Sequence, residues 1–372
     1  MNKPSILILN SSVIYGGGEF FAYRLAVNLK KRGYGVYLGC RNDTLLYKKC
    51  SNEGINAYHL EFPKRGASGL GKNIKAIRKI IKDDNIQIVH SNTNYDRTAG
   101  AFARRGTKAK HAASCHSLES IQHNITHYIR NKYLTHHFIA DGESIKRLLI
   151  NENKIPEEKI TIVHNGINSN EMRRKPELGS AVRNEFGVKS DELLIGNLGR
   201  LVIFKGQKYL LTAFKGITEN FSNVKLMIVG DGELYNSLKD YTNVMGINDR
   251  VIFTGFREDL RAVYSAFDIY CHPSIEGGGE LFPFSVLYAM AQGIPVIATR
   301  VGDIPQMVKD GINGYLVSEK SPFQISEKLM IMVNNPELRN KVGKEGLTIL
   351  LDNFTEDKMV NKIEEVYKKL IK

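Results

Sequence analysis

Residues 274–296 read SIEGGGELFPFSVLYAMAQGIPV, and the rest of the chain is organised around them. A glycine run cannot hold a regular element and Gly-Ile-Pro ends one, so we predict a short helix over about residues 284–292. Glu280 stands just before it. A helix N-terminus carries unpaired N–H groups and a partial positive charge, and a glycine-rich approach brings a ligand close to the backbone. The pattern indicates a polar pocket for an anion such as a diphosphate. An ordinary strand-to-helix turn is the alternative.

Apolar segments of strand length alternate with helical patterns along the whole chain. Residues 5–10 (SILILN) begin one series, and residues 192–200 (ELLIGNLGR) begin another after a polar linker near residues 170–180. This alternation is typical of parallel, doubly wound sheets. We therefore expect an α/β protein of two Rossmann-like domains facing across a cleft, with the ligand at the carboxyl ends of the strands. The last helical pattern, residues 355–371, has an apolar face that must dock on another element.

Length and composition favour a globular protein without a membrane span. The chain has 372 residues, of which 42% are hydrophobic, and this length suits about two domains. No apolar run approaches the roughly 18 to 20 residues that span a bilayer. Residues 5–9 are too short for a signal-peptide core, so we expect a chain that starts at Met1 in the cytoplasm. The cysteines have neither metal-site spacing nor the density of a disulfide framework, which predicts buried thiols at Cys40, Cys50, Cys115 and Cys271.

The formal net charge of +13 calls for an acidic partner. Residues 64–82 hold seven lysines and arginines, no acidic residue, and four isoleucines at helical spacing. A basic helix at a membrane surface has this pattern, but we favour a helix whose isoleucines face the core. Its lysines remain available for peripheral contact with anionic lipid at the inner face of the membrane. We expect no nucleic-acid partner, because the helix lacks interleaved aromatic residues and no recognised module is present.

The first strand-to-helix turn does not fit a dinucleotide cofactor. Gly16, Gly17 and Gly18 are consecutive and do not give the spacing G-x-G-x-x-G, so we expect no nicotinamide or flavin site. The acidic residues at 83–84 and at Asp231 fit solvated turns, so no divalent-metal site is expected either.

Four residues with useful chemistry follow predicted strands. Arg200 and Lys205 lie in GRLVIFKG, where they could offer positive charge to a departing diphosphate or serve only as surface charges. His116 and His90 also end strands, where a histidine can bond a ligand hydroxyl or carry a proton, although a structural histidine is commoner. Neither histidine has a Ser or Cys in a nucleophile-elbow context, so a hydrolase triad has no support.

Taken in order, these motifs resemble the family-4 retaining glycosyltransferases of the GT-B fold (glycosyltransferase group 1) over nearly the whole chain. GGGE (16–19) resembles the glycine loop of the acceptor-side domain, HNGIN (164–168) the Asn-Gly element, and residues 274–296 the donor-binding E-x7-E segment. VGDGEL and FTGF fall in the expected order. The resemblance implies an acceptor-side domain at 1–175, a nucleotide-sugar-binding domain at 176–354, and a helix at 355–372 that packs back onto the first domain.

The resemblance also implies the site residues. His116 would contact the donor sugar and Glu280 would hold its hydroxyls, and these two are the expected catalytic residues. The expected donor-binding residues are Gly17, Arg200, Lys205, Phe256, Glu280, Pro283, Phe284, Ser285 and Tyr288. The expected acceptor-side residues are Gly16, Glu19 and His90.

The sequence departs from the family pattern at one important position. Alignment of AMAQGIPV with the usual E-A-M-A-x-G-x-P-V places Tyr288 where the second glutamate stands, with Glu280 as the first. That glutamate commonly accepts from the ribose hydroxyls, whereas a tyrosine offers one hydroxyl and a larger ring. Either Tyr288 substitutes for it, or the donor is held differently, or binding is weak, or the ring is merely packed.

Together these features lead us to expect a metal-independent retaining glycosyltransferase without a cofactor. It would transfer a sugar from a nucleotide-diphosphate sugar to a hydroxyl of a glycan or lipid-linked acceptor, in bacterial surface polysaccharide or lipopolysaccharide synthesis. The first alternative is a subunit without activity that binds a sugar nucleotide or a partner enzyme. The second is a sugar-nucleotide epimerase.

Overall fold

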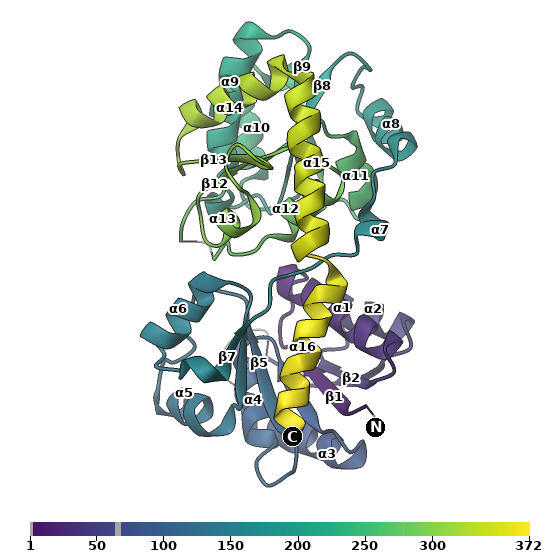
Figure 1. The fold of residues 1–372 in the computed structure, drawn as a ribbon, viewed down its shortest axis with the longest axis vertical. Helices are drawn as coiled ribbons and strands as arrows, with labels where there is room; N and C mark the ends of the chain where they lie inside the picture. Colours follow the sequence, from purple (N-terminus) through teal and green to yellow (C-terminus); the bar gives the residue numbers. More distant parts are fainter. Residues whose placement is uncertain (1–2, 64–67, 278) are drawn as a thin grey trace. The chain divides into compact units, whose positions relative to one another are not determined.

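The computed structural model describes residues 3–63, 68–277 and 279–372, which fold into two units (Figure 1). Unit 1 comprises residues 1–165 together with the C-terminal residues 356–372, and unit 2 comprises residues 166–355. Our sequence boundary lay ten residues later, at 175/176. The difference arises because the Ile167 N–H donates to the Phe354 carbonyl at 3.1 Å and Ile167 forms a parallel bridge with Thr355. The first residues after 165 therefore pair with the end of unit 2.

Unit 1 is built on a seven-stranded parallel sheet. Its strands lie in the order β3-β2-β1-β4-β5-β6-β7. The direction in which successive strands are added to the sheet therefore reverses once, between β3 and β4. Their bounds are β1 (Ser5–Leu9), β2 (Gly35–Cys40), β3 (Asn56–His59), β4 (Ile88–Ser91), β5 (Lys110–Cys115), β6 (His137–Ala140) and β7 (Ile160–Ile162). This is the doubly wound order that the alternating sequence predicted.

Helices cover both faces of this sheet. They are α1 (Gly17–Lys31), α2 (Leu45–Asn52), α3 (Leu70–Asp83), α4 (Asn94–Ala103), α5 (Ile125–Ile129) with the π-helical turn η1 (Arg130–Leu134), α6 (Glu143–Asn151) and α16 (Glu356–Ile371). On one face, Ile77 and Ile81 of α3 share a buried cluster with Val89 of β4. The isoleucines of the basic helix thus face the core, as predicted. Lys64 and Arg65, from the same basic stretch, lie outside the described residues.

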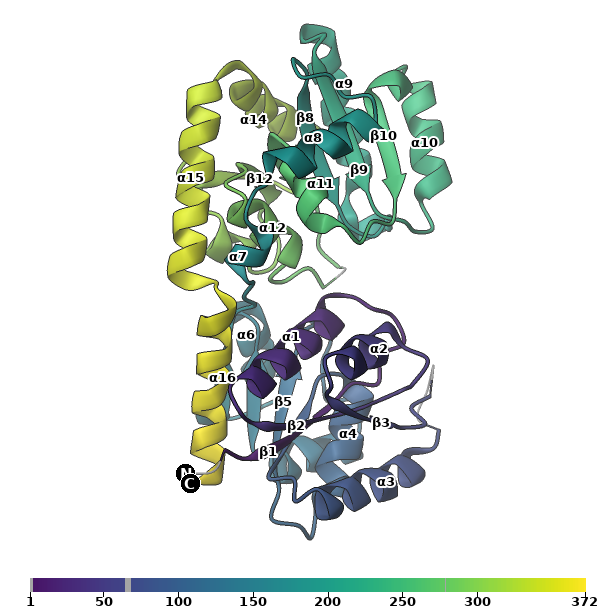
Figure 2. The same ribbon diagram turned by 90° about the vertical axis from the view of Figure 1, so that its right-hand side faces the viewer.

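Helix α16 belongs to unit 1 although it ends the chain (Figure 2). It lies against α1, and the Arg24 guanidinium of α1 forms an ion pair with Glu356. Successive residues of a strand point to opposite faces, so His90 lies on the face opposite Val89 and bonds Tyr367 of α16. Met359 and Ile363 of α16 are also buried. The expected docking of the last helix on the first domain is therefore confirmed.

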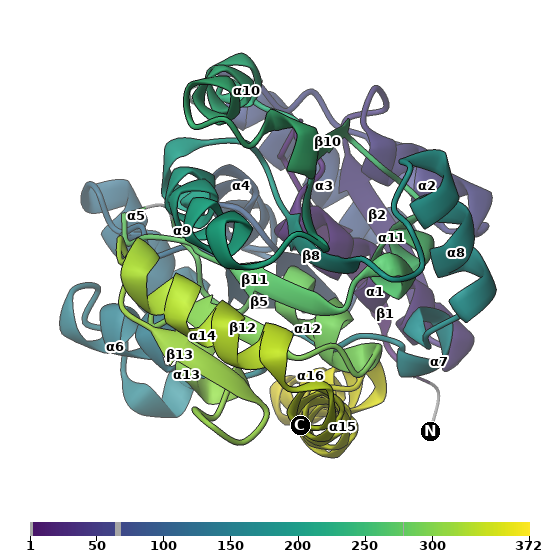
Figure 3. The same cartoon turned by 90° about the horizontal axis from the view of Figure 1, so that it is seen from above.

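Unit 2 has a six-stranded parallel sheet in the order β10-β9-β8-β11-β12-β13. Figure 3 shows its inner strands side by side. The bounds are β8 (Leu193–Leu198), β9 (Val224–Val229), β10 (Val251–Gly255), β11 (Ile269–His272), β12 (Val296–Thr299) and β13 (Gly314–Val317). The helices are α7 (Ser169–Met172), α8 (Pro176–Glu185), α9 (Gln207–Asn220), α10 (Tyr235–Val244), α11 (Leu260–Ala266), α12 (Phe284–Ala291), α13 (Ile304–Met307), α14 (Pro322–Asn334) and α15 (Pro336–Asn353).

Two further expectations can be compared with the structure. The four cysteines are buried and none of them forms a disulfide. Among the described residues, no helix combines the length and the apolar character that a membrane crossing requires.

Candidate functional site

The candidate site in unit 2 lies where loops leave the carboxyl ends of β8, β11 and β12. Two glycines allow these loops to approach closely. A Cβ at Gly206, whose φ is +67°, would lie 1.9 Å from the Pro273 carbonyl oxygen after β11. A Cβ at Gly302, after β12, would lie 2.0 Å from the carbonyl oxygen of Glu280. The loops are therefore locked together around Glu280 by contacts that only glycine permits.

Glu280 is the centre of a buried polar network in these loops. Its carboxylate is 7% exposed and forms an ion pair with the Lys205 ammonium. The Ser274 hydroxyl donates to Glu280 Oε2 at 2.8 Å, and His272 Nε2 lies 3.3 Å from the same oxygen. His272 Nδ1 in turn lies 3.3 Å from the Tyr270 hydroxyl. The end of β11 and the loops after β8 and β11 thus fix one carboxylate in position.

Burial and charge act in opposite directions on this carboxylate. Burial alone would raise the pKa of Glu280, but the Lys205 ammonium and the neighbouring His272 outweigh it and hold that pKa well below its ordinary value. Glu280 is therefore ionised at neutral pH. A fixed anion beside a cation is a suitable arrangement for holding the hydroxyl groups of a ligand.

Helix α12 begins directly after this network. The sequence predicted a short helix over residues 284–292, and the structure has it at Phe284–Ala291, with Pro283 before it and Gln292 after it. The Ser285 hydroxyl in its first turn lies 3.4 Å from His272 Nδ1. The N-terminus of α12 therefore opens beside the Glu280 network, as an anion site requires. Gly278, in the glycine run, lies outside the described residues.

Tyr288 is packed among aromatic rings. It is buried, its ring centroid lies 5.8 Å from that of Tyr264 in an edge-to-face arrangement, and Phe284 lies 6.4 Å away. Tyr288 therefore takes part in the packing of α12 against α11, and its role toward a donor stays a prediction.

The remaining donor-side residues lie at the same edge of the sheet. Arg200 follows β8 and is exposed, with its guanidinium carbon 5.6 Å from the centre of the Phe204 ring, the same distance as Lys205 Nζ. Phe256 follows β10 and is 71% exposed. An exposed cation and an exposed ring at a strand-end edge are both accessible to a ligand. Pro283, by contrast, is buried.

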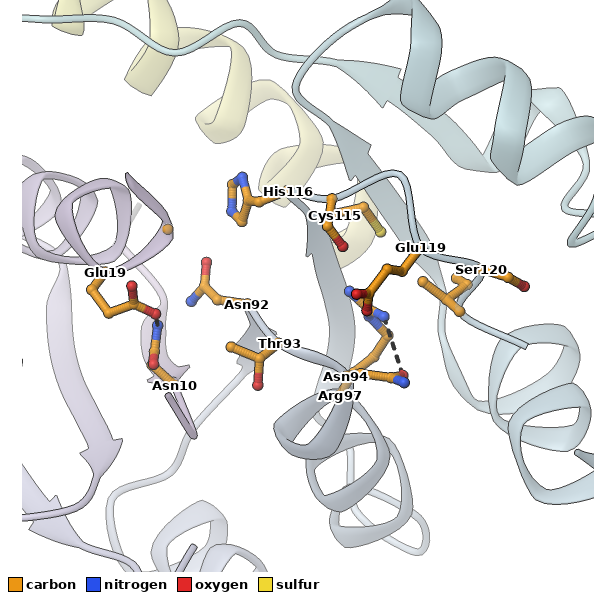
Figure 4. Close-up of a pocket in the computed structure, with 13 residues that line it drawn as sticks. Asn10, Glu19, Asn92, Thr93, Asn94, Arg97, Cys115, His116, Glu119 and Ser120 are labelled. Carbon is orange, nitrogen blue, oxygen red and sulfur yellow. Dashed lines mark hydrogen bonds between the residues drawn. The ribbon is translucent and has the colours of Figure 1, made fainter. Parts of the chain in front are cut away.

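Unit 1 has a pocket of its own, with a volume of about 270 Å³, at the carboxyl ends of β1, β4 and β5 (Figure 4). Its lining is mainly polar. The polar residues that line it are Asn10, Glu19, Asn92, Thr93, Asn94, Arg97, His116, Ser117, Glu119 and Ser120.

The glycine loop forms one wall of this pocket. Gly16 precedes α1 and Gly17 begins it. The Glu19 carboxylate accepts from the Gly16 N–H at 2.9 Å and from the Asn10 amide at 3.3 Å. Glu19 therefore caps its own helix and also lines the pocket.

His116 lies beside the glycine loop, since a Cβ at Gly18 would be 3.8 Å from its ring. Its ring packs on Phe21 at 4.7 Å between centroids, and its Nδ1 lies 3.7 Å from the buried Asp141 carboxylate. Its other ring nitrogen, Nε2, is buried and has no hydrogen-bond partner among the residues that the structure describes. Two further lining groups, Asn92 Oδ1 and Arg97 Nε, are in the same situation. Unsatisfied buried polar atoms are rare, and around a pocket they indicate a place for a ligand.

His90, which the sequence analysis assigned to the acceptor side, does not line this pocket. It is fully buried, its Nε2 lies 2.7 Å from the Ser114 hydroxyl, and its Nδ1 bonds the Tyr367 hydroxyl. Burial lowers its pKa to about 3, helped by the nearby His116. Since both ring nitrogens are occupied, His90 fastens α16 to the sheet.

Several polar residues of the two sites were not among those predicted from the sequence. His272 and Ser274 stand in the segment FDIYCHPS and complete the Glu280 network. Asn92 ends the segment IQIVHSN, and Arg97 lies one turn into the following helix. All but Arg97 stand at or just after strand ends, which is the signal that could have identified them.

Both units match known glycosyltransferase sequences. A family model described as Glycosyltransferase Family 4 matches residues 15–171, and one described as Glycosyl transferases group 1 matches residues 180–348. The fold is therefore that of a GT-B protein, and the chain belongs to the group 1 glycosyltransferases, with a family-4 N-terminal half.

Individual proteins show the same likeness. A UDP-Gal:alpha-D-GlcNAc-diphosphoundecaprenol alpha-1,3-galactosyltransferase of Escherichia coli is 25% identical over 309 residues, or 80% of this chain and 79% of that protein. The structure of a glycosyltransferase from Rickettsia africae has a TM-score of 0.91 at 22% identity and covers both chains fully. Anabaena HepE in complex with UDP has a TM-score of 0.85 at 20% identity over 98% of this chain and 100% of that one.

Proposed function

We propose that this protein transfers a sugar, with retention at the anomeric carbon, from a nucleotide-diphosphate sugar to a hydroxyl of a glycan or lipid-linked acceptor. The observation that carries the proposal is the network of Lys205, Glu280, Ser274 and His272 beside the N-terminus of α12. It combines a fixed anion for sugar hydroxyls with a cation and a helix terminus for a diphosphate. Synthesis of bacterial surface polysaccharide or lipopolysaccharide is the setting that we propose for it.

We further propose a uridine nucleotide as the donor. The name of the Escherichia coli relative specifies UDP-Gal, and HepE was solved with UDP. The exposed ring of Phe256 at the same strand-end edge is suited to stacking with a base.

In the mechanism that we propose, unit 2 stabilises the leaving group. Arg200, Lys205 and the first turn of α12 would carry the negative charge that develops on the diphosphate as the glycosidic bond breaks. Glu280 would hold the sugar hydroxyls, and His116 of unit 1 would contact the sugar. The departing phosphate would take the proton of the acceptor hydroxyl on the same face, so that no divalent metal and no enzymic nucleophile would take part.

A donor screen tests this proposal. The purified protein is incubated with UDP-, GDP-, ADP- and TDP-sugars, and slow release of the nucleoside diphosphate is measured. We expect release from a UDP-sugar, abolished in Glu280→Ala. Release that persists unchanged in that variant would remove Glu280 from the site.

The packed Tyr288 favours a second candidate, a GT-B subunit that binds a sugar nucleotide or a partner enzyme without transfer. The two candidates differ in a binding titration. UDP binding with neither transfer nor donor hydrolysis would favour the subunit, and turnover would exclude it.

A further inference from the structure

Unit 2 has a further pocket, at the edge of its sheet opposite the Glu280 network. Its volume is about 710 Å³. It is lined by Leu193, which begins β8, and by Asn223 and Asp268, which directly precede β9 and β11. The Glu280 network lies at the carboxyl ends of the same parallel sheet, so the lengths of β8 and β11 separate the two places. We call this cavity the amino-edge pocket.

Three arginines line the amino-edge pocket near one shared carboxylate. Arg183 forms an ion pair with Asp268, which also accepts from the Leu194 N–H at 2.8 Å. Partial removal from water lowers the pKa of Arg174 and of Arg339, and the negative charge of Asp268 opposes the shift in both. One carboxylate thus lies within electrostatic range of three guanidinium groups. This local excess of positive charge attracts an anion.

The other carboxylates of the lining do not cancel this excess. Glu192 forms an ion pair with Lys225, so its charge is already balanced. Asp191 is exposed, and solvent therefore screens its charge. Among the residues that the structure describes, neither Arg174 nor Arg339 forms an ion pair of its own. Their two positive charges are left for a ligand.

These two arginines also keep hydrogen-bond donors in reserve. Arg174 Nη2 donates to the carbonyls of Phe267 at 2.9 Å and Ser265 at 3.4 Å. Arg339 Nη1 donates to two carbonyls in the last turn of α14. Within the described parts of the chain, the other two guanidinium nitrogens of each arginine have no partner. Guanidinium groups with free donors are well suited to the oxygen atoms of a phosphate.

The surrounding elements favour the same kind of ligand. Helices α8 and α15 begin at Pro176 and Pro336, which both line the pocket. A helix N-terminus carries a partial positive charge, which adds here to the charge of the arginines. The exposed hydroxyl groups of Ser180 and Ser190 also line the pocket and can bond the polar remainder of a ligand.

We propose that the amino-edge pocket binds a small phosphate ester, such as a sugar phosphate, whose phosphate group is held by Arg174 and Arg339. The volume falls within the range of about 300 to 1,000 Å³ that is usual for small-molecule pockets, and is far larger than a lone phosphate ion needs. The inference goes beyond the proposed function, because none of the described residues that line the pocket belongs to the Glu280 network.

Calorimetric titration of the full chain tests the proposal. The probes are glucose 6-phosphate, inorganic phosphate and glucose, each added in the presence of excess UDP so that the donor site is occupied. We expect glucose 6-phosphate to bind more tightly than inorganic phosphate, and glucose not to bind. If inorganic phosphate bound as tightly as the ester, the assignment to an ester would be wrong, and if neither bound, the proposal as a whole would be overturned.

Arginine variants assign the binding to this pocket. Arg174→Ala/Arg339→Ala should bind glucose 6-phosphate at least about tenfold more weakly than the wild type, because charge-assisted hydrogen bonds are lost. Arg250→Ala is the matched control, since it removes a guanidinium that donates to the Phe221 carbonyl at 2.6 Å but does not line the pocket. Equal affinity in the double variant and the control would contradict the proposal.

A second variant leaves every arginine in place. Ser180→Glu adds a negative charge at an exposed lining position of α8 and should also weaken binding at least about tenfold, by repulsion of the phosphate. Ala181→Glu adds the same charge at the next, exposed residue of α8, which does not line the pocket, and should bind like the wild type. Unchanged binding in Ser180→Glu would place the ligand elsewhere.

A titration with UDP alone separates this inference from the proposed function. All four variants should bind UDP like the wild type, because the changed residues lie at the opposite edge of the sheet from the Glu280 network. Normal UDP binding also shows that unit 2 of each variant is folded. UDP binding without binding of glucose 6-phosphate would refute only the amino-edge pocket, and the reverse result would refute only the donor site.

Discussion

The two units share a parallel, doubly wound sheet but differ in charge and in histidine content. Unit 1 has 31 basic and 17 acidic residues and a net charge of +14, whereas unit 2 has 21 basic and 22 acidic residues and a net charge of −1. Unit 1 also has nine of the ten histidines, and the only one in unit 2 is His272. The same architecture thus occurs here with two different charge distributions. Unit 1 carries a large excess of positive charge, whereas unit 2 has nearly balanced charges that act locally, as in the ion pair of Lys205 and Glu280.

The largest effect that we expect comes from breaking the local pair in unit 2. Glu280→Ala leaves the half-buried Lys205 without its partner and should lower the free energy of unfolding of unit 2 by about 3 kcal/mol. Calorimetry of the full chain measures this. Glu185→Ala is the matched control, because its pair with Arg257 is more exposed and should contribute less than about 1 kcal/mol. If the two variants lost equal free energy of unfolding, the burial of an ion pair would not determine how much it stabilises unit 2.

The next effect concerns turnover without folding. Arg200 is exposed and its side chain holds no buried partner, so Arg200→Ala should lower kcat by about 100-fold, or about 2.7 kcal/mol, through lost stabilisation of the leaving group. The melting temperature should stay near that of the wild type. Lys208→Ala removes a nearby surface cation that lies over Tyr241 and serves as the control. Near-normal turnover in Arg200→Ala would show that Arg200 does not stabilise the leaving group.

Acid should destabilise unit 1 before unit 2. Burial holds the pKa of His90 at about 3 and that of His111 well below 6.5, so both stay neutral in the folded state but take up protons when unfolded. Stability then falls as pH drops below about 6.5, with a slope that approaches about 1.4 kcal/mol per pH unit for each. The lowered pKa of Glu280 stabilises unit 2 above about pH 4.5, and this stabilisation is lost only at lower pH.

Calorimetry at about pH 7.5, 6 and 5 follows the unfolding transitions of the two units. UDP, the proposed ligand of unit 2, should raise the melting temperature of that unit and so identify its transition. A transition of unit 2 that falls first would contradict the assignment of the acid-sensitive groups.

The smallest effect should come from metal removal. If side chains and the helix terminus of unit 2 carry the charge of the leaving group, EDTA should change turnover by less than about twofold. A strong loss of turnover that Mg²⁺ or Mn²⁺ restores would show that the side chains and helix terminus of unit 2 are not enough to stabilise the leaving group.

Hydrophobic periodicity and glycine placement were enough to predict both sheets, the short helix α12 and an apolar face on the last helix. The docking of that helix on the first domain was predicted from the family resemblance. Inner strands such as β4, β11 and β12 are buried on both faces and therefore read as continuous apolar runs, and Gly-Ile-Pro ends α12 where expected. Helix α2 was not anticipated, since its cap at Thr44 and its apolar residues Leu46 and Cys50 form too short a pattern.

The sites were harder to predict because their partners are distant in the sequence. Lys205 and Glu280 meet only because Gly206 and Gly302 let three loops touch. His90 and His116 look alike as strand-end histidines, yet one is satisfied by Ser114 and Tyr367 and the other lines a pocket. Tertiary contacts alone separate the two.

Helix α16 also has a consequence for the order in which the protein is made. When a ribosome has synthesised residue 165, every strand of unit 1 exists, but Tyr367 and Glu356, the partners of His90 and Arg24, do not. Domains generally fold as units during synthesis, N-terminal first. Here unit 2 is translated completely before the last helix emerges, so the nascent first unit waits with its sheet partly uncovered, and the first domain to begin folding is the last to finish.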